Sequence, residues 1–144
     1  AAYVGSIVGK HISRDWPEGS LVALNTAGST PYFAFQHRFI DMLGLNDPHI
    51  AKRNVQKIEL PWQRKPGHLK GDGAYVLSRN PDFIIIGPAN GTVVEKPWFL
   101  SDLEIGRDPN FKINYELHQV KIDPAEGATN QRWIIFTYYQ RIKR

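Results

Sequence analysis

The first hydrophobic positions along the chain predict a helix followed by a buried strand. Apolar side chains recur at helical spacing from Tyr3 to Trp16, with Lys10 and Arg14 on the polar side. Trp16 precedes a proline, and a residue before proline avoids the helical region, so the helix ends there. The apolar run Leu21–Leu24 follows a Glu-Gly turn and is typical of a buried strand.

The next residues predict a compact strand–helix–strand unit. Pro31 suits the first position of a helix, and Thr30 is then expected to cap that helix. Residues 39–43 form a second apolar strand, which contains Asp41. Asp47, again followed by proline, predicts the start of another short helix. A crossover this short implies two parallel strands with a right-handed connection.

A long irregular segment divides this unit from the rest of the chain. Residues 54–71 lose the hydrophobic period and predict a loop, after which Asp72 is expected to cap a helix. Residues 83–86 form the most hydrophobic strand, which we expect at the centre of the sheet. Asp102 and Asp108 are expected to begin two more short helices.

The last third of the chain predicts an antiparallel hairpin. Residues 115–122 and 133–142 are rich in aromatic and β-branched side chains, and the polar segment 123–131 joins them. The whole pattern predicts an α/β fold: a three-layer sandwich with a mixed sheet of about five strands and a Rossmann-like N-terminal half. No linker or repeat divides residues 1–144, so they are expected to form a single domain.

Composition narrows the function classes. The chain has 144 residues, no cysteine and a formal net charge of +4. Without cysteine there is no disulfide, thiolate metal site or cysteine nucleophile. The small positive charge fits either attraction to anions or a plainly basic surface, and no nucleic-acid motif accompanies it, so no nucleic-acid partner is expected. No apolar run approaches the length of a membrane span.

Candidate ligand contacts follow from the predicted topology, because ligands of open α/β sheets favour the carboxyl ends of parallel strands. This edge, together with the irregular loop, gives the candidate substrate-binding residues Asn25, Thr30, Asp41, Asn46, Asp47, His49, Trp62, His68 and Lys70. Each has a structural alternative, as a turn, cap or packing residue. Asp41 has a functional and a structural interpretation. In the functional one it accepts from a sugar or ribose hydroxyl or acts as a general base. In the structural one its carboxylate pairs with a nearby backbone N–H or basic residue.

Aromatic residues divide between core and surface in this prediction. Trp16, Trp98 and Trp133 are expected in the core. Trp62 lies among charges in the irregular loop and is the best candidate for an exposed platform that stacks on a sugar, with core packing as its alternative.

Catalytic and cofactor motifs are incomplete. The turn after the first strand has one glycine, Gly28, where a dinucleotide fingerprint has three, so no cofactor is expected. No two histidines have the spacing of a metal site, and no GxSxG nucleophile elbow is present. No catalytic residue is assigned.

Three strings carry a resemblance to a known family. They are VALNTAGSTPYFA, FIDMLGLNDPHIAKR and PGHLKGDGAYVLSRNPDFIIIG. They resemble the C-terminal soluble region of bacterial polytopic membrane proteins of the GT-C glycosyltransferase type, similar to mycobacterial arabinofuranosyltransferases. The string SDLEIGRDPNFKINYELHQV resembles that region more loosely.

The resemblance implies a function for the parent protein and for this domain. The parent would transfer a sugar from a polyprenyl-phosphate donor at the outer face of the bacterial cell membrane. This chain would be its soluble periplasmic or extracytoplasmic domain, not catalytic alone, and would assist acceptor or glycan binding. Expected partners are the membrane-spanning part of the same chain, a cell-envelope glycan or polyprenyl-phosphate sugar, and an anionic lipid surface. The alternatives are a protein-interaction module without a small-molecule site and a free-standing nucleotide-binding α/β protein.

Overall fold

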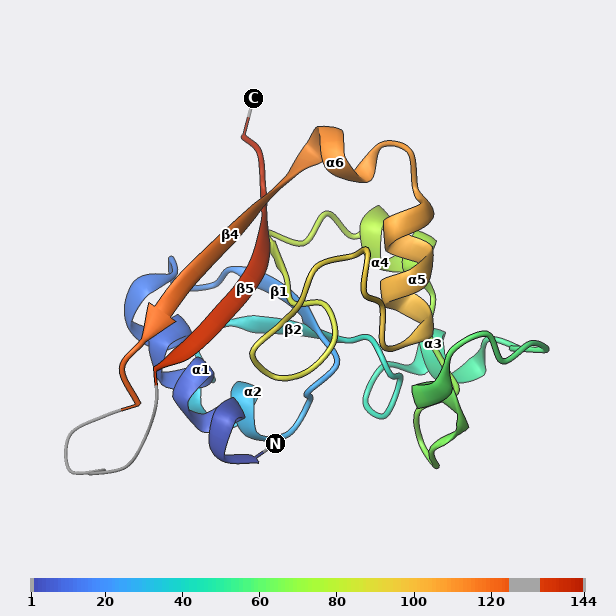
Figure 1. The fold of residues 1–144 in the computed structure, drawn as a ribbon, viewed down its shortest axis with the longest axis horizontal. Helices are drawn as coiled ribbons and strands as arrows, with labels where there is room; N and C mark the ends of the chain where they lie inside the picture. Colours follow the sequence, from blue (N-terminus) through green and yellow to red (C-terminus); the bar gives the residue numbers. More distant parts are fainter. Residues whose placement is uncertain (1, 125–132, 144) are drawn as a thin grey trace.

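The computed structural model describes residues 2–124 and 133–143, and its centre is a mixed five-stranded sheet. The strand order is β2-β1-β3-β5-β4 (Figure 1). The strands are β1 Leu21–Leu24, β2 Arg38–Asp41, β3 Phe83–Ile84, β4 Tyr115–Ile122 and β5 Ile134–Arg141. β1 pairs in parallel with β2 and with β3, while β5 runs antiparallel to both β3 and β4. The predicted parallel pair and C-terminal hairpin are therefore confirmed.

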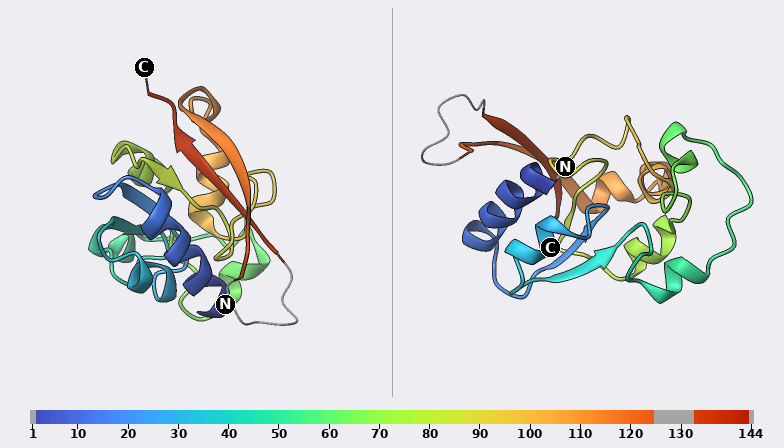
Figure 2. Two further views of the ribbon diagram at one scale, coloured as in Figure 1. Left: turned by 90° about the vertical axis from the view of Figure 1, so that its left-hand side faces the viewer. Right: turned by 90° about the horizontal axis from the view of Figure 1, so that it is seen from below.

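Helices cover both faces of the sheet. They are α1 Ala2–Asp15, α2 Ser29–Phe33, α3 Pro48–Lys52, the 3₁₀ turn η1 Pro61–Arg64, α4 Gly73–Ser78, α5 Leu100–Arg107 and α6 Phe111–Asn114. Figure 2 shows α1 and the α4–α5 pair on opposite sides of the strands. Two apolar cores result, one under α1 around Ile12 and Phe136, and one under α3 to α6 around Ile84 and Ile105. The structure is thus the predicted α/β sandwich.

β3 is short but central. It has two residues, Phe83 and Ile84, and the chain stays buried through Ile86 before turning. Trp16 stacks on Phe83 with ring centroids 3.7 Å apart, so the predicted core position of Trp16 is confirmed. Trp133 is 60% exposed, so its predicted place in the core is wrong. Trp133 lies just before β5 begins, one residue beyond the last strand pair of the hairpin.

α1 and α2 pack closely because α1 carries glycines on the contact face. A Cβ on Gly9 would lie 2.7 Å from the carbonyl oxygen of Thr30. Thr30 was predicted to cap α2, but this prediction is wrong. Thr30 lies inside the helix, since α2 begins at Ser29. Its hydroxyl donates instead to the carbonyl oxygen of Gly5 at 3.2 Å. The prediction failed because Pro31 is accommodated in the first turn of a helix as well as at its first position.

The other predicted helix starts are partly corrected. Asp47 and Asp72 cap α3 and α4 as predicted, with carboxylates that accept from backbone N–H groups. Asp102 is not a cap, because α5 begins two residues earlier, at Leu100. Asp108 ends α5, and α6 begins at Phe111. The polar connection 123–131 of the hairpin lies mostly outside the described residues.

Candidate functional site

The carboxyl ends of the three parallel strands meet at one edge of the sheet, as predicted. Asn25 follows β1, Asp41 ends β2, and Gly87 follows the buried run after β3. The side-chain amide of Asn25 donates to the carbonyl oxygen of Gly87 at 3.2 Å and to Asp102 Oδ1 at 2.9 Å. Both side chains are buried, so Asn25 links this edge to α5 and serves the fold.

Asp41 organises the turn that follows β2. Its Oδ1 accepts from the backbone N–H of Leu43 at 3.0 Å, and its Oδ2 accepts from that of Asn46 at 2.7 Å. Of the roles predicted for Asp41, the structure therefore shows the structural one, in which its carboxylate accepts from nearby backbone N–H groups. Each carboxylate oxygen still has a second lone pair, so the group keeps acceptor capacity. Asn46 exposes its side chain and contributes only its backbone N–H to this turn.

Asp47 connects α3 to α4. Its Oδ1 accepts from the backbone N–H groups of His49 at 3.0 Å and Ile50 at 3.2 Å, which satisfies two free donors at the start of α3. Its Oδ2 accepts from the hydroxyl of Tyr75 on α4 at 3.2 Å. The buried carboxylate thus acts as helix cap and tertiary bond at once.

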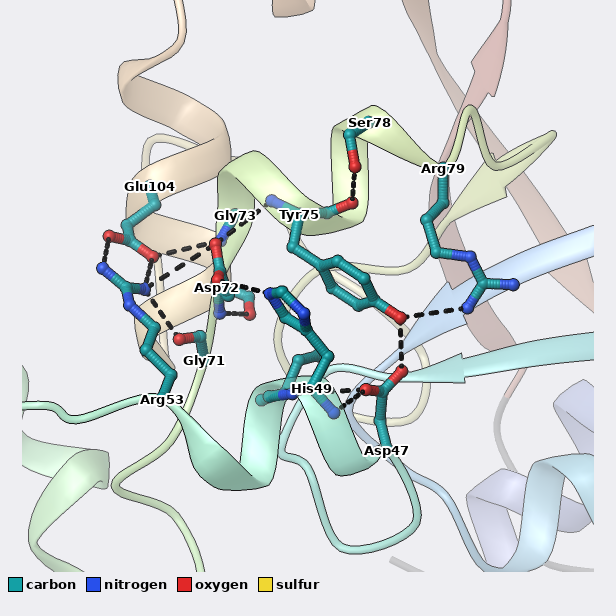
Figure 3. A network of polar contacts seen from close by, with 12 residues as sticks. Asp47, His49, Arg53, Gly71, Asp72, Gly73, Tyr75, Ser78, Arg79 and Glu104 are labelled. Carbon is teal, nitrogen blue, oxygen red and sulfur yellow. Dashed lines mark hydrogen bonds and ion pairs between the residues drawn. The ribbon is translucent and has the colours of Figure 1, made fainter.

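A polar cluster lies on the surface between α3 and α4 (Figure 3). We call Asp47, His49, Asp72, Tyr75 and Arg79 the α3–α4 cluster. The imidazole of His49 stacks on the ring of Tyr75, with centroids 3.9 Å apart and planes 10° apart. Its Nε2 lies 3.3 Å from Asp72 Oδ2. The side chain of His49 is 55% exposed and Arg79 is exposed as well, so both are available to a ligand.

Next to the α3–α4 cluster, Arg53 after α3 forms an ion pair with Glu104 on α5. Arg53 donates two parallel bonds to the carboxylate of Glu104, at 2.6 and 2.9 Å, and a third to the carbonyl oxygen of Gly71 at 2.7 Å. The hydrogen bonds to Glu104 raise the pKa of Arg53 above its ordinary value. Lys70 donates to the carbonyl oxygen of Arg53 at 2.5 Å. These contacts fix both ends of the loop 54–71.

We expect Arg53→Ala to release this loop without unfolding the domain. Bidentate Arg–carboxylate pairs are among the stronger ion pairs, but Arg53 is 34% exposed, so the pair is expected to contribute about 1 kcal/mol to stability. A double-mutant cycle with Glu104→Ala, read by urea unfolding, measures that coupling. Amide exchange of residues 54–71 should accelerate in both single variants. Protection equal to the wild type in this loop would contradict the role of the pair.

A small open pocket lies beside Asp41 and Asp47. Its volume is about 160 Å³, and its lining residues are Leu24, Ala27, Pro31, Phe39, Asp41, Asn46 and Asp47. Apolar side chains form one part of the wall, and two carboxylates with one amide form the other. Carboxylates accept hydrogen bonds from hydroxyls and repel anions. The pocket therefore suits a neutral ring that carries hydroxyl groups and is unsuited to a phosphate.

The three candidates in the irregular loop, Trp62, His68 and Lys70, do not line this pocket. Trp62 is half-buried and stacks in parallel on Trp98 at 4.5 Å, while the ammonium of Lys65 lies 4.0 Å from its ring centroid. Trp98 and the ammonium of Lys65 both contact the Trp62 indole, so the packing alternative that the sequence left open for Trp62 is realised in this structure. His68 is 5.4 Å from the ring of Phe99, measured between centroids.

Sequence reasoning missed several members of the site. Tyr75 was not among the candidates, yet its hydroxyl donates to Asp47. Arg53 and Glu104 are 51 residues apart and give no local signal of their pairing. A polar hydroxyl on an otherwise apolar helix face was the only sign that pointed to Tyr75.

The comparisons with known proteins define a family without a described activity. Residues 2–137 match a family described as Domain of unknown function (DUF8728), and the chain belongs to that family. No curated protein and no solved structure matches the chain. Across residues 2–124 and 133–143, no group of three or more metal-ligating acids, histidines or cysteines comes together. None of the helices in that same part of the chain is long and apolar enough to cross a membrane.

Proposed function

We propose that this chain is an accessory domain of a membrane glycosyltransferase of the GT-C type, placed at the outer face of a bacterial cell membrane. The parent protein uses a polyprenyl-phosphate sugar donor, and this domain assists the binding of the acceptor glycan without catalysing the transfer itself. The parent's membrane-spanning part is the domain's natural partner.

One observation supports the proposal most. The three strings that carry the family resemblance converge on one edge of the fold. Asn25 of the first string bonds Gly87 of the third, and Asp47 of the second bonds Tyr75 of the third. The strings also supply core residues such as Val22, Ile40 and Ile84, and the first two strings together supply every residue that lines the pocket.

The chemistry of the pocket favours a glycan over the alternatives. Two carboxylates and an amide beside apolar side chains match the hydroxyl and C–H surfaces of one sugar ring. A nucleotide would bring phosphates toward Asp41 and Asp47, which is unfavourable. The short helix after β1 begins without a side-chain cap, so its free N–H groups attract anions, but Asp41 and Asp47 line the same pocket and oppose that attraction.

A titration of the isolated domain with neutral pentofuranosides, hexopyranosides and short disaccharides tests the proposal. We expect amide shifts in NMR spectra at residues 27–31 and 41–47. Asn46→Ala should weaken binding about three- to tenfold, as expected for one lost hydrogen bond, because the exposed Asn46 side chain lines the pocket while its structural bond uses the backbone. Asn110→Ala is the matched control, since Asn110 is also exposed and lies in a different pocket.

Two outcomes would overturn the proposal. If no glycan shifts any resonance, the domain is an interaction module without a small-molecule site. If the gene encodes no hydrophobic span on either side of this domain, the domain is not part of a membrane enzyme. Several hydrophobic spans encoded upstream of Ala1 are the expected finding.

A further inference from the structure

A second surface, on α1 and α2, exposes aromatic rings beside basic side chains. Tyr32 on α2 is 75% exposed and Phe35, just after α2, is 84% exposed. The ring of Phe33 contacts that of Tyr32, with centroids 5.0 Å apart. Lys10 on α1 lies over the Phe33 ring at 5.0 Å. We call Lys10, Arg14, Tyr32, Phe33 and Phe35 the α1–α2 surface.

The exposure of these rings is not a by-product of a loose fold. α1 and α2 are held together by glycine contacts and by hydrogen bonds from Thr30 and from Gln36 to α1, so the short helix is fixed in place. Phe35 nevertheless points its ring into solvent. A large aromatic ring that is almost fully exposed on a fixed backbone indicates a surface that is covered in the protein's working environment.

The charges around the rings identify the kind of cover. Lys10 and Arg14 are four residues apart on α1, so they lie on the same helix face, and both are exposed. The adjacent acid Asp15 lies 3.0 Å from His11 Nδ1, and burial lowers the pKa of His11, so Asp15 keeps its charge beside Arg14. A surface of aromatic rings with flanking basic residues is complementary to the headgroup layer of an anionic membrane, where rings enter the interface and cations pair with lipid phosphates.

We infer that the α1–α2 surface docks on an anionic lipid membrane. Phe35 and Tyr32 enter the headgroup region, and Lys10 and Arg14 bind lipid phosphates. The occupant is a lipid surface rather than a second copy of the chain, because the same face on another copy would place Lys10 and Arg14 against their own like charges. The inference does not depend on the sugar pocket, because none of the five residues of the α1–α2 surface lines that pocket.

Co-sedimentation with vesicles tests this inference. The purified domain is mixed with vesicles of phosphatidylcholine alone or with 30% phosphatidylglycerol, a composition of about one anionic lipid in three. We expect binding to the anionic vesicles only, and loss of that binding as salt is raised. Phe35→Ser should lower the partition coefficient roughly tenfold, as expected for one aromatic ring. Lys10→Gln should lower it roughly fivefold.

The matched controls replace an exposed apolar residue and an exposed lysine outside the α1–α2 surface. Leu45→Ser removes an apolar side chain that is 66% exposed, and Lys57→Gln removes an exposed lysine. Equal losses in these controls would overturn the inference, as would equal binding to neutral vesicles. Sedimentation of the free domain as a dimer that Phe35→Ser dissociates would assign the surface to a second copy instead. Asn46→Ala should leave vesicle binding unchanged, so failure here and failure of sugar binding are distinguishable.

Discussion

Replacing Asp102 by alanine is expected to lower the free energy of unfolding by about 4 kcal/mol, enough to unfold much of a marginally stable domain. Its side chain is fully buried on α5. One oxygen accepts from the Asn25 amide, and the other accepts from the backbone N–H groups of Gly87, Trp98 and Phe99 at 3.0 to 3.1 Å. Alanine would leave these donors buried without an acceptor. Urea unfolding followed by circular dichroism measures the loss.

The control for this prediction is Asp108→Ala, which removes a carboxylate that accepts from the backbone N–H of Asn110 at the surface. Its cost should stay below about 1 kcal/mol. Asp102→Asn keeps one acceptor oxygen but turns an amide toward Asn25, so its cost should fall between the two. Equal stability of the two alanine variants would show that Asp102 does not hold the edge of the sheet to α5.

Asp102 also predicts how stability changes with pH. Burial raises the pKa of Asp102 above its ordinary value, although the hydrogen bonds from Asn25 and the backbone oppose this. The folded domain therefore keeps a proton at pH values where the unfolded chain has lost it. The stabilisation from this proton is complete below the unfolded pKa and declines as pH rises toward the higher folded pKa. Asp102→Asn should lose that decline, which unfolding at a series of acidic pH values would reveal.

Local features were predictable from the sequence and distant pairings were not. Asp47 and Asp72 were predicted as caps because the signal, an acid before a helix, lies within four residues of its consequence. The cap assigned to Thr30 failed because α2 begins one residue earlier, at Ser29, and the bond of its hydroxyl to Gly5, 25 residues earlier, gave no local signal. Asp102 was misplaced because α5 begins two residues earlier, at Leu100, and its bond with Asn25, 77 residues away, gave no local signal.

The candidate site followed the same division. Asp41, Asn46 and Asp47 were predicted at one edge from strand order alone, and they line one pocket. The stacking of His49 on Tyr75 and of Trp62 on Trp98 depends on how α3, α4 and the irregular loop are placed, which no residue spacing encodes. Topology therefore located the edge, and only the three-dimensional structure separated the pocket from the packing around it.

Replacing Gly91 by alanine is expected to prevent the domain from folding, with a loss above about 4 kcal/mol. Gly91 has φ of +76°, and an added Cβ would lie 1.8 Å from the carbonyl oxygen of Thr137 on β5. That oxygen cannot move aside, because the N–H of Thr137 is bonded to Asn90 and β5 lies inside the sheet. The turn after β3 would have to separate from β5. Urea unfolding, or the loss of dispersed amide resonances, reports the result.

Gly19→Ala separates the clash from the strain of the backbone. Gly19 has a similar φ of +80°, but a Cβ there would meet nothing within 4 Å. Its cost should therefore be the left-handed conformation alone, about 1 to 2 kcal/mol. If Gly91→Ala cost no more than Gly19→Ala, the turn would be free to move away from β5. In that case the contact between Gly91 and Thr137 would not hold the chain after β3 against the sheet. It would also not be needed to place Gly87 for its bond with Asn25.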